Sequence, residues 1–158
     1  MIARGPDPGM APRVRAALLG IFVFGAAGTA AELLLLEHTE HLAQWVPLVL
    51  IAASLAVLAA HAALRGPGTV RVFHVVMLAF LGAGVTGMAL HFRGNVEFER
   101  EMHPGHGRWD LFRGAMTGAT PALAPGTMIM LGAIGLLYAY RHPAVMERFG
   151  VGATPGEE

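Results

Sequence analysis

The segment "EHTEH", Glu37 to His41, places two carboxylates and two imidazoles directly after four leucines. Glu37 and His41 are four residues apart, a spacing that brings two side chains together on one face of a helix. Carboxylate and imidazole ligands together suit a divalent ion such as Zn, Mn, Fe or Cu. The segment therefore predicts Glu37, His38, Glu40 and His41 as ligands of a divalent transition metal ion.

A second group of candidate ligands begins where another apolar stretch ends. His91 leads into "FRGNVEFEREMHPGHGRWD", which is rich in acidic residues and histidine. We expect His91 to supply a ligand from a facing helix and Glu97 or Glu99 to close the site, because bundles build metal sites from facing helices. The same segment adds Glu101, His103, His106 and Asp110 as further candidates.

The same residues admit a simpler interpretation, in which the carboxylates mark the water boundary of membrane helices. They would then pair with Arg93, Arg100 and Arg113 as solvated surface charges. The chain contains no nucleophile elbow, phosphate-binding glycine loop, dinucleotide fingerprint or HExxH pattern. The motifs therefore predict no reaction, and whether the protein is an enzyme stays open.

Glu32 lies about one helical turn before Glu37, among alanines and leucines. A carboxylate at membrane depth is costly unless it is protonated or paired. Its helical face also carries Gly25, Gly28 and Thr29, which predicts that Glu32 points into the bundle as a buried partner of the outer cluster. It would act there as a ligand or proton relay, or as a neutral acid that is hydrogen-bonded to a neighbouring helix.

His61 and His74 flank the tight turn "RGPG" and support an alternative cofactor. Two imidazoles on adjacent helices could ligate a haem b. A simpler interpretation makes both histidines interfacial residues whose ring tips reach water.

The composition indicates a membrane protein. Of the 158 residues, 54% are hydrophobic and 14% are charged, and the mean hydropathy is +0.54, so the expected partner of the surface is the lipid bilayer. The formal net charge is zero, which argues against a nucleic-acid partner. The absence of cysteine excludes disulfides and thiolate metal sites.

Four apolar stretches approach the roughly 20 residues that a membrane-spanning helix needs. They cover about 16–36, 46–64, 70–92 and 119–140. The predicted fold is all-α, an integral membrane four-helix bundle with a longer outer loop between the third and fourth spans. Residues 1–15 are expected to form a disordered tail, 16–142 a single transmembrane domain and 143–158 a short tail. Small residues at helical spacing, Gly25, Gly84, Gly87, Gly132 and Gly135, are expected to let the helices approach.

Two features near the fourth stretch predict local departures from a simple span. The segment "GRWDLFRGAM" is typical of a short amphipathic element on the outer surface, with Trp109 and Phe112 as interfacial anchors. Pro121 and Pro125 predict that the fourth helix starts late or irregularly.

The arginines predict the orientation, because cytoplasmic loops carry an excess of positive charge. A cytoplasmic N-terminus in the cell membrane puts Arg4, Arg13, Arg15, Arg65, Arg71, Arg141 and Arg148 inside and leaves Arg93, Arg100, Arg108 and Arg113 outside. Both termini are therefore expected in the cytoplasm. In a rival interpretation, residues 1–31 form a cleaved signal peptide.

These observations together predict a small multi-pass membrane protein whose outer face binds a divalent transition metal ion. Two alternatives from other classes are a haem b electron-transfer protein and a non-catalytic accessory subunit. The partners would be the bilayer and a second copy or another member of a membrane complex.

Overall fold

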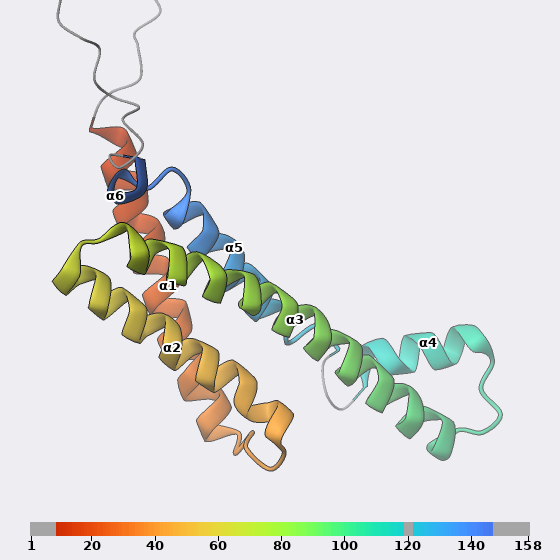
Figure 1. Ribbon diagram of the computed structural model, residues 1–158. Helices are drawn as coiled ribbons and strands as arrows, with labels where there is room; N and C mark the ends of the chain where they lie inside the picture. The colour runs from red at the N-terminus through yellow and green to blue at the C-terminus, as the bar shows by residue number, and fades with distance from the viewer. Residues whose placement is uncertain (1–8, 119–121, 147–158) are drawn as a thin grey trace, which may run out of the picture.

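The computed structural model describes residues 9–118 and 122–146 of the chain. All regular structure in these residues is helical, as predicted (Figure 1). Of the predicted tails, residues 1–8 and 147–158 lie outside the described residues, as do residues 119–121 of the fourth apolar stretch. Residues 10–15, expected in the disordered tail, belong to the first helix. The helices are α1 (Met10–Leu35), α2 (Leu42–Leu64), α3 (Pro67–Met102), α4 (Arg108–Thr117), α5 (Gly126–Ala139) and α6 (Pro143–Met146).

Three of these helices, α1, α2 and α3, are long and apolar enough to cross a membrane. Many of their large apolar side chains face outward, including Phe24, Leu35 and Leu42, each more than four-fifths exposed. An apolar surface of this extent suits lipid better than water. The helices therefore indicate a protein that lies in a lipid bilayer.

The fourth apolar stretch forms a shorter helix than expected. α5 contains 14 residues, which at about 1.5 Å per residue span roughly 21 Å, less than the roughly 30 Å of a hydrocarbon core. Ala122 to Pro125 form turns, and Pro125 occupies the N-cap of α5. The helix thus starts late because proline cannot donate the backbone hydrogen bond that a helix interior needs.

Small residues set the packing of α5 against its neighbours. A Cβ on Gly135 would overlap the side chain of Met77 in α3, and a Cβ on Gly84 would lie 3.0 Å from the Pro125 carbonyl oxygen. On the other side, α1 approaches so closely that a Cβ on Gly25 would lie 2.8 Å from Leu131. The expected close packing at small residues is confirmed at these positions.

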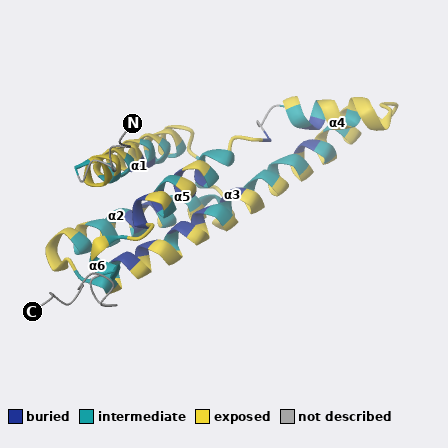
Figure 2. Ribbon diagram, turned by 90° about the horizontal axis from the view of Figure 1, so that it is seen from above, coloured by how far each residue is buried: buried dark blue, intermediate teal, exposed yellow. Residues whose placement is uncertain are grey.

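The buried side chains gather where α1, α3 and α5 meet. Phe22 packs edge-on against Phe73, with 5.5 Å between ring centroids, and lies 6.0 Å from Phe80. Met77 and Leu131 complete this centre. Figure 2 shows the buried residues running along α3 and α5, while the outward faces of the helices are exposed.

α3 is longer than the third apolar stretch. Its 36 residues span about 54 Å at about 1.5 Å per residue, well beyond the roughly 30 Å of a hydrocarbon core. α4 folds back beside its C-terminal end, away from α1 and α2 (Figure 1). The segment that the sequence predicted as an outer loop is therefore mostly a helical hairpin made by the end of α3 and by α4.

Candidate metal centre

Glu99, His103 and His106 bring one carboxylate and two imidazoles together at the C-terminal end of α3. Nδ1 of His103 lies 3.2 Å from Oε2 of Glu99, and Nδ1 of His106 lies 3.9 Å from the same oxygen. One possible ligand atom from each residue lies within 4.8 Å of the others. Atoms that bind one ion at about 2.0–2.2 Å lie roughly 3–4 Å apart, so small side-chain movements would bring all three to one ion.

The local backbone explains how these three residues meet. Glu99 and His103 are four residues apart at the end of α3, and the His103 N–H donates to the Glu99 carbonyl oxygen at 2.9 Å. Pro104 then prevents the helix from continuing. The chain turns so that the His106 N–H donates to the His103 carbonyl oxygen at 3.0 Å. This turn brings the imidazole of His106 against that of His103.

The two imidazole rings are stacked, with centroids 4.5 Å apart and planes inclined by 3°. The nitrogen lone pairs of parallel rings do not meet at one point, so a shared ion requires the rings to tilt apart. The side chains of His103 and His106 are 49% and 41% exposed, which leaves them room to tilt. The rings of His103 and His106 therefore lie close to the positions that would bind one ion, and a tilt of the rings would complete the site.

The hairpin holds the carboxylate of this group in place. The side chain of Glu99 is only 13% exposed, because it lies against Gly114 of α4, where a Cβ would come within 2.6 Å of its Cδ atom. One turn earlier on α3, the buried Asn95 donates from Nδ2 to the carbonyl oxygen of Ala115 at 2.8 Å. α4 is therefore tied to α3 beside the carboxylate.

The three side chains offer two nitrogens and one oxygen, a donor set that suits Zn, Mn, Fe or Cu. Metal sites with three protein ligands leave coordination positions to water or substrate. The imidazoles bind metal only in their unprotonated form, so protons compete with the ion.

The structure does not form the helical arc expected of Glu37, Glu40 and His41. α1 ends at Leu35, and Glu37 has a left-handed backbone with φ of 51°. The N–H of Glu37 donates to the Leu34 carbonyl oxygen at 3.1 Å, and that of His38 to the Leu33 carbonyl oxygen at 3.0 Å, as in a Schellman motif. The segment is therefore a turn between two helices.

The remaining predicted ligands lie apart from Glu99. His38 and His91 approach each other, with 6.3 Å between ring centroids, and the buried Nδ1 of His91 has no hydrogen-bond partner. Glu40 and His41 are exposed in the α1–α2 connection. Glu97 pairs with Arg93 at 3.0 Å in an exposed ion pair.

Glu32 was expected to point into the bundle, but it is exposed on α1. Of the residues expected on the packing side of α1, Gly25 meets Leu131 near the middle of α5, whereas Gly28 is exposed and a Cβ there would meet nothing within 4 Å. α5 begins only at Gly126. Seven residues beyond Gly25, α1 has run past the helix that would have covered the carboxylate.

The two histidines of the haem interpretation do not face each other as a pair. His74 is exposed on α3. The Nδ1 atom of His61 lies 2.7 Å from the hydroxyl of Thr69, and its ring stands 5.1 Å from that of His142. The ring partner of His61 is therefore at the end of α5.

Sequence reasoning included Glu99 among the ligands but left His103 and His106 outside the preferred set. Glu99 and His103 have the same four-residue spacing as Glu37 and His41, the pair that motivated the prediction. The spacing went unused because the segment was expected to be a loop. Arg93 and Glu97 are also four residues apart, a spacing that a continuing helix brings together.

Comparisons with protein-family models, with curated proteins and with solved structures return no match for this chain.

Proposed function

We propose that the protein is an integral membrane protein that binds a divalent transition metal ion in the aqueous layer, through Glu99, His103 and His106. The observation that carries this proposal is the convergence of three ligand atoms within 4.8 Å on a hairpin that projects beyond the apolar part of α3. An ion can reach the exposed histidines directly from water. The mostly buried carboxylate of Glu99 is held in position by α4.

The donor set favours Zn, Mn, Fe or Cu over Mg or Ca, because imidazole is a poorer ligand for those harder ions. Two neutral imidazoles and one carboxylate carry one negative charge, so a bound divalent ion leaves a net charge of plus one. Water or an anionic ligand completes the coordination sphere. Capture and exchange of metal at the membrane surface is the role that this open arrangement supports best.

The arginine distribution supports a location of the hairpin on the outer side of the cell membrane. Among the described residues, Arg13, Arg15, Arg65, Arg71 and Arg141 lie at the ends of helices opposite the hairpin, whereas Arg93, Arg100, Arg108 and Arg113 lie in or near it. With Arg4 and Arg148, counted from the sequence alone, the balance is seven against four. Cytoplasmic loops keep such an excess of basic residues. Both termini are then cytoplasmic, and the site binds metal ions from the solution outside the cell.

Calorimetry and elemental analysis of the purified full-length chain test the proposal with Zn²⁺ and Mn²⁺ as probes. Glu99→Gln, His103→Ala and His106→Ala should each weaken binding by at least about tenfold. Glu97→Gln is the matched control, because it removes an exposed carboxylate from the same helix. Metal binding that survives all three ligand variants, or that Glu97→Gln weakens equally, contradicts the proposed site. His41→Ala tests the predicted ligands of the segment Glu37 to His41 separately and should leave the metal affinity unchanged.

A further inference from the structure

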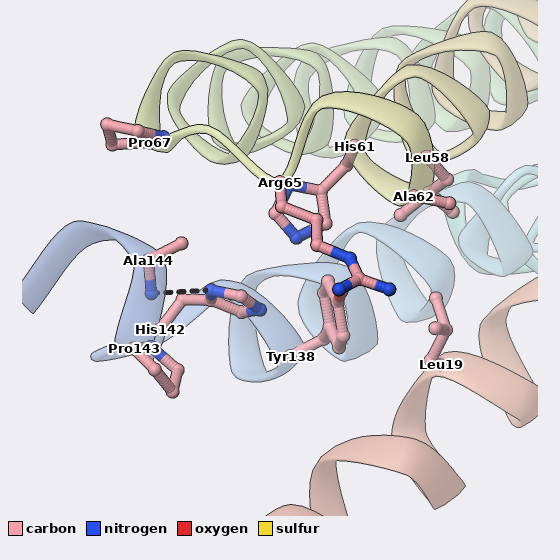
Figure 3. A pocket seen from close by; sticks show the side chains of 10 residues that line it. All are labelled: Leu19, Leu58, His61, Ala62, Arg65, Pro67, Tyr138, His142, Pro143 and Ala144. Atoms are coloured by element: carbon pink, nitrogen blue, oxygen red, sulfur yellow. Dashed lines mark hydrogen bonds between the residues drawn. The ribbon is translucent and has the colours of Figure 1, made fainter.

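A second candidate site lies at the opposite end of the helices, where residues of α1, α2, α3, α5 and α6 line an open pocket of about 1000 Å³. Figure 3 shows His61 and Arg65 entering it from the end of α2, and Tyr138 and His142 from the end of α5. Leu19 and Leu58 form part of its apolar wall. The volume is at the upper end of the roughly 300–1,000 Å³ of pockets for drug-sized ligands.

The hydrogen bonds of this cavity fix which ring nitrogen of each histidine carries a proton. The hydroxyl of Thr69 donates to the Gly66 carbonyl oxygen at 2.7 Å, so its oxygen accepts from Nδ1–H of His61 at 2.7 Å. In His142, Nδ1 accepts the N–H of Ala144 at 3.3 Å. Neutral His142 therefore carries its proton on Nε2, which makes that atom a hydrogen-bond donor.

The charged and titratable residues lining the cavity carry no negative charge at neutral pH. Arg65, which follows α2 with φ of 49°, supplies a guanidinium, and none of the ten lining residues is acidic. From α1, Arg15 reaches the carbonyl oxygen of Tyr138 at 3.3 Å. A guanidinium and an N–H donor that line the same pocket match the oxygens of a phosphate group.

The apolar wall restricts the ligand further. Leu19, Leu58 and Ala62 extend from the polar end along helices that cross the membrane. An ion surrounded by water would gain nothing from this wall, whereas an acyl chain would bury apolar surface there. Basic pockets between membrane helices at the cytoplasmic side are typical binding places for anionic lipid headgroups.

We propose that this cavity binds an anionic phospholipid, with its phosphate at Arg65 and His142 and an acyl chain along Leu19 and Leu58. The site is separate from the metal-binding hairpin and does not depend on it. The lipid would bridge the ends of α1, α2 and α5 and so hold the cytoplasmic end of the bundle together.

Native mass spectrometry of the full-length chain in detergent tests this proposal, with phosphatidylglycerol, phosphatidylcholine and inorganic phosphate as separate probes. Phosphatidylglycerol should bind at least about fivefold more tightly than phosphatidylcholine, and Arg65→Gln should weaken its binding about fivefold, because it removes the guanidinium that pairs with the phosphate. His142→Ala should also weaken it. Arg13→Gln, which removes an exposed arginine outside the cavity, should change the affinity by less than about twofold.

Three outcomes would overturn the lipid site. Equal affinity for the two lipids would remove the charge argument, and equal losses in Arg65→Gln and Arg13→Gln would indicate general surface attraction. Tight binding of inorganic phosphate, with displacement of phosphatidylglycerol, would identify a site for a soluble phosphate compound. A thermal melt of each variant confirms that any lost binding reflects the site and not unfolding.

Discussion

The carboxylate of Glu99 lies against the backbone of Gly114, so closely that a Cβ on Gly114 would be 2.6 Å from Cδ and 2.7 Å from Oε2 of Glu99. This contact joins the last turns of α3 to α4. It directs the Glu99 carboxylate toward His103 and His106, whose Nδ1 atoms lie 3.2 Å and 3.9 Å from Oε2. The glycine therefore positions the carboxylate of the proposed metal site from outside that site.

Gly114→Ala should weaken metal binding by about tenfold, in the range for residues that orient ligands. The added methyl group displaces the Glu99 side chain, which can move, so the fold is retained. Gly94→Ala is the control, because a Cβ there meets nothing within 4 Å. Both changes favour helix formation by up to about 1 kcal/mol. Equal metal affinities in the two variants, measured by calorimetry, would contradict the positioning role.

Asn95→Ala should loosen α4. The change removes the hydrogen bond from Nδ2 to the Ala115 carbonyl oxygen, and an unsatisfied buried group costs about 1–3 kcal/mol. Hydrogen exchange should show faster exchange of α4 amides, and metal affinity should fall because Glu99 loses its support. As a comparison, Arg93→Ala breaks only an exposed ion pair, worth at most about 1 kcal/mol. Unchanged exchange in α4 after Asn95→Ala would show that other contacts hold the hairpin.

The pKa of His142 predicts a loss of stability in acid. Burial lowers this pKa below its ordinary value, and the positive charges of His61 and Arg15 lower it further. The unfolded chain then takes up the proton first as pH falls below about 6.5, so the free energy of unfolding decreases from that pH down to the folded pKa. Thermal melts across this range should show a steeper decline for the wild type than for His142→Ala. Parallel declines would mean that His142 does not contribute.

The membrane orientation is tested with reporter fusions. Arg15 donates to the carbonyl oxygen of Tyr138 at 3.3 Å, which places the start of α1 and the end of α5 at the same end of the molecule. The rings of His61 and His142, 5.1 Å apart, place the end of α2 there as well. Reporters fused after Leu64 and after Tyr140 should therefore read alike, and the arginine excess predicts that they read cytoplasmic. A reporter within 105–107 should read external. An external signal after Leu64 would reverse the orientation and place the proposed metal site on the cytoplasmic side.

The long apolar helices followed from the sequence because hydropathy and helix length are local properties. The extension of α3 to Met102 did not, since hydropathy ends near Phe92 while the helix continues through contacts with α4 at Asn95 and Glu99. These contacts join segments fifteen to twenty residues apart, and hydropathy does not report them. Glu37 illustrates the opposite error, because a left-handed residue ends the helix where side-chain spacing alone suggested that it continued.

Glu32 provides a further test, because its exposed position on α1 differs from the buried one that its sequence context suggested. It lies three residues before the end of α1 at Leu35, where a carboxylate can reach toward the interface. Glu32 is not part of the group formed by Glu99, His103 and His106.

Glu32→Leu and Glu32→Gln should therefore preserve both folding and metal content. The leucine variant should be at least as stable as the wild type, because a lipid-facing carboxylate costs free energy that leucine does not. Thermal melts and elemental analysis of both variants, beside Glu99→Gln as the metal-free reference, measure the two effects separately. A destabilisation of more than about 1 kcal/mol in Glu32→Leu but not in Glu32→Gln would reveal a lost polar contact. Such a contact would come from outside the described residues, for example from a second chain that covers Glu32 in an oligomer.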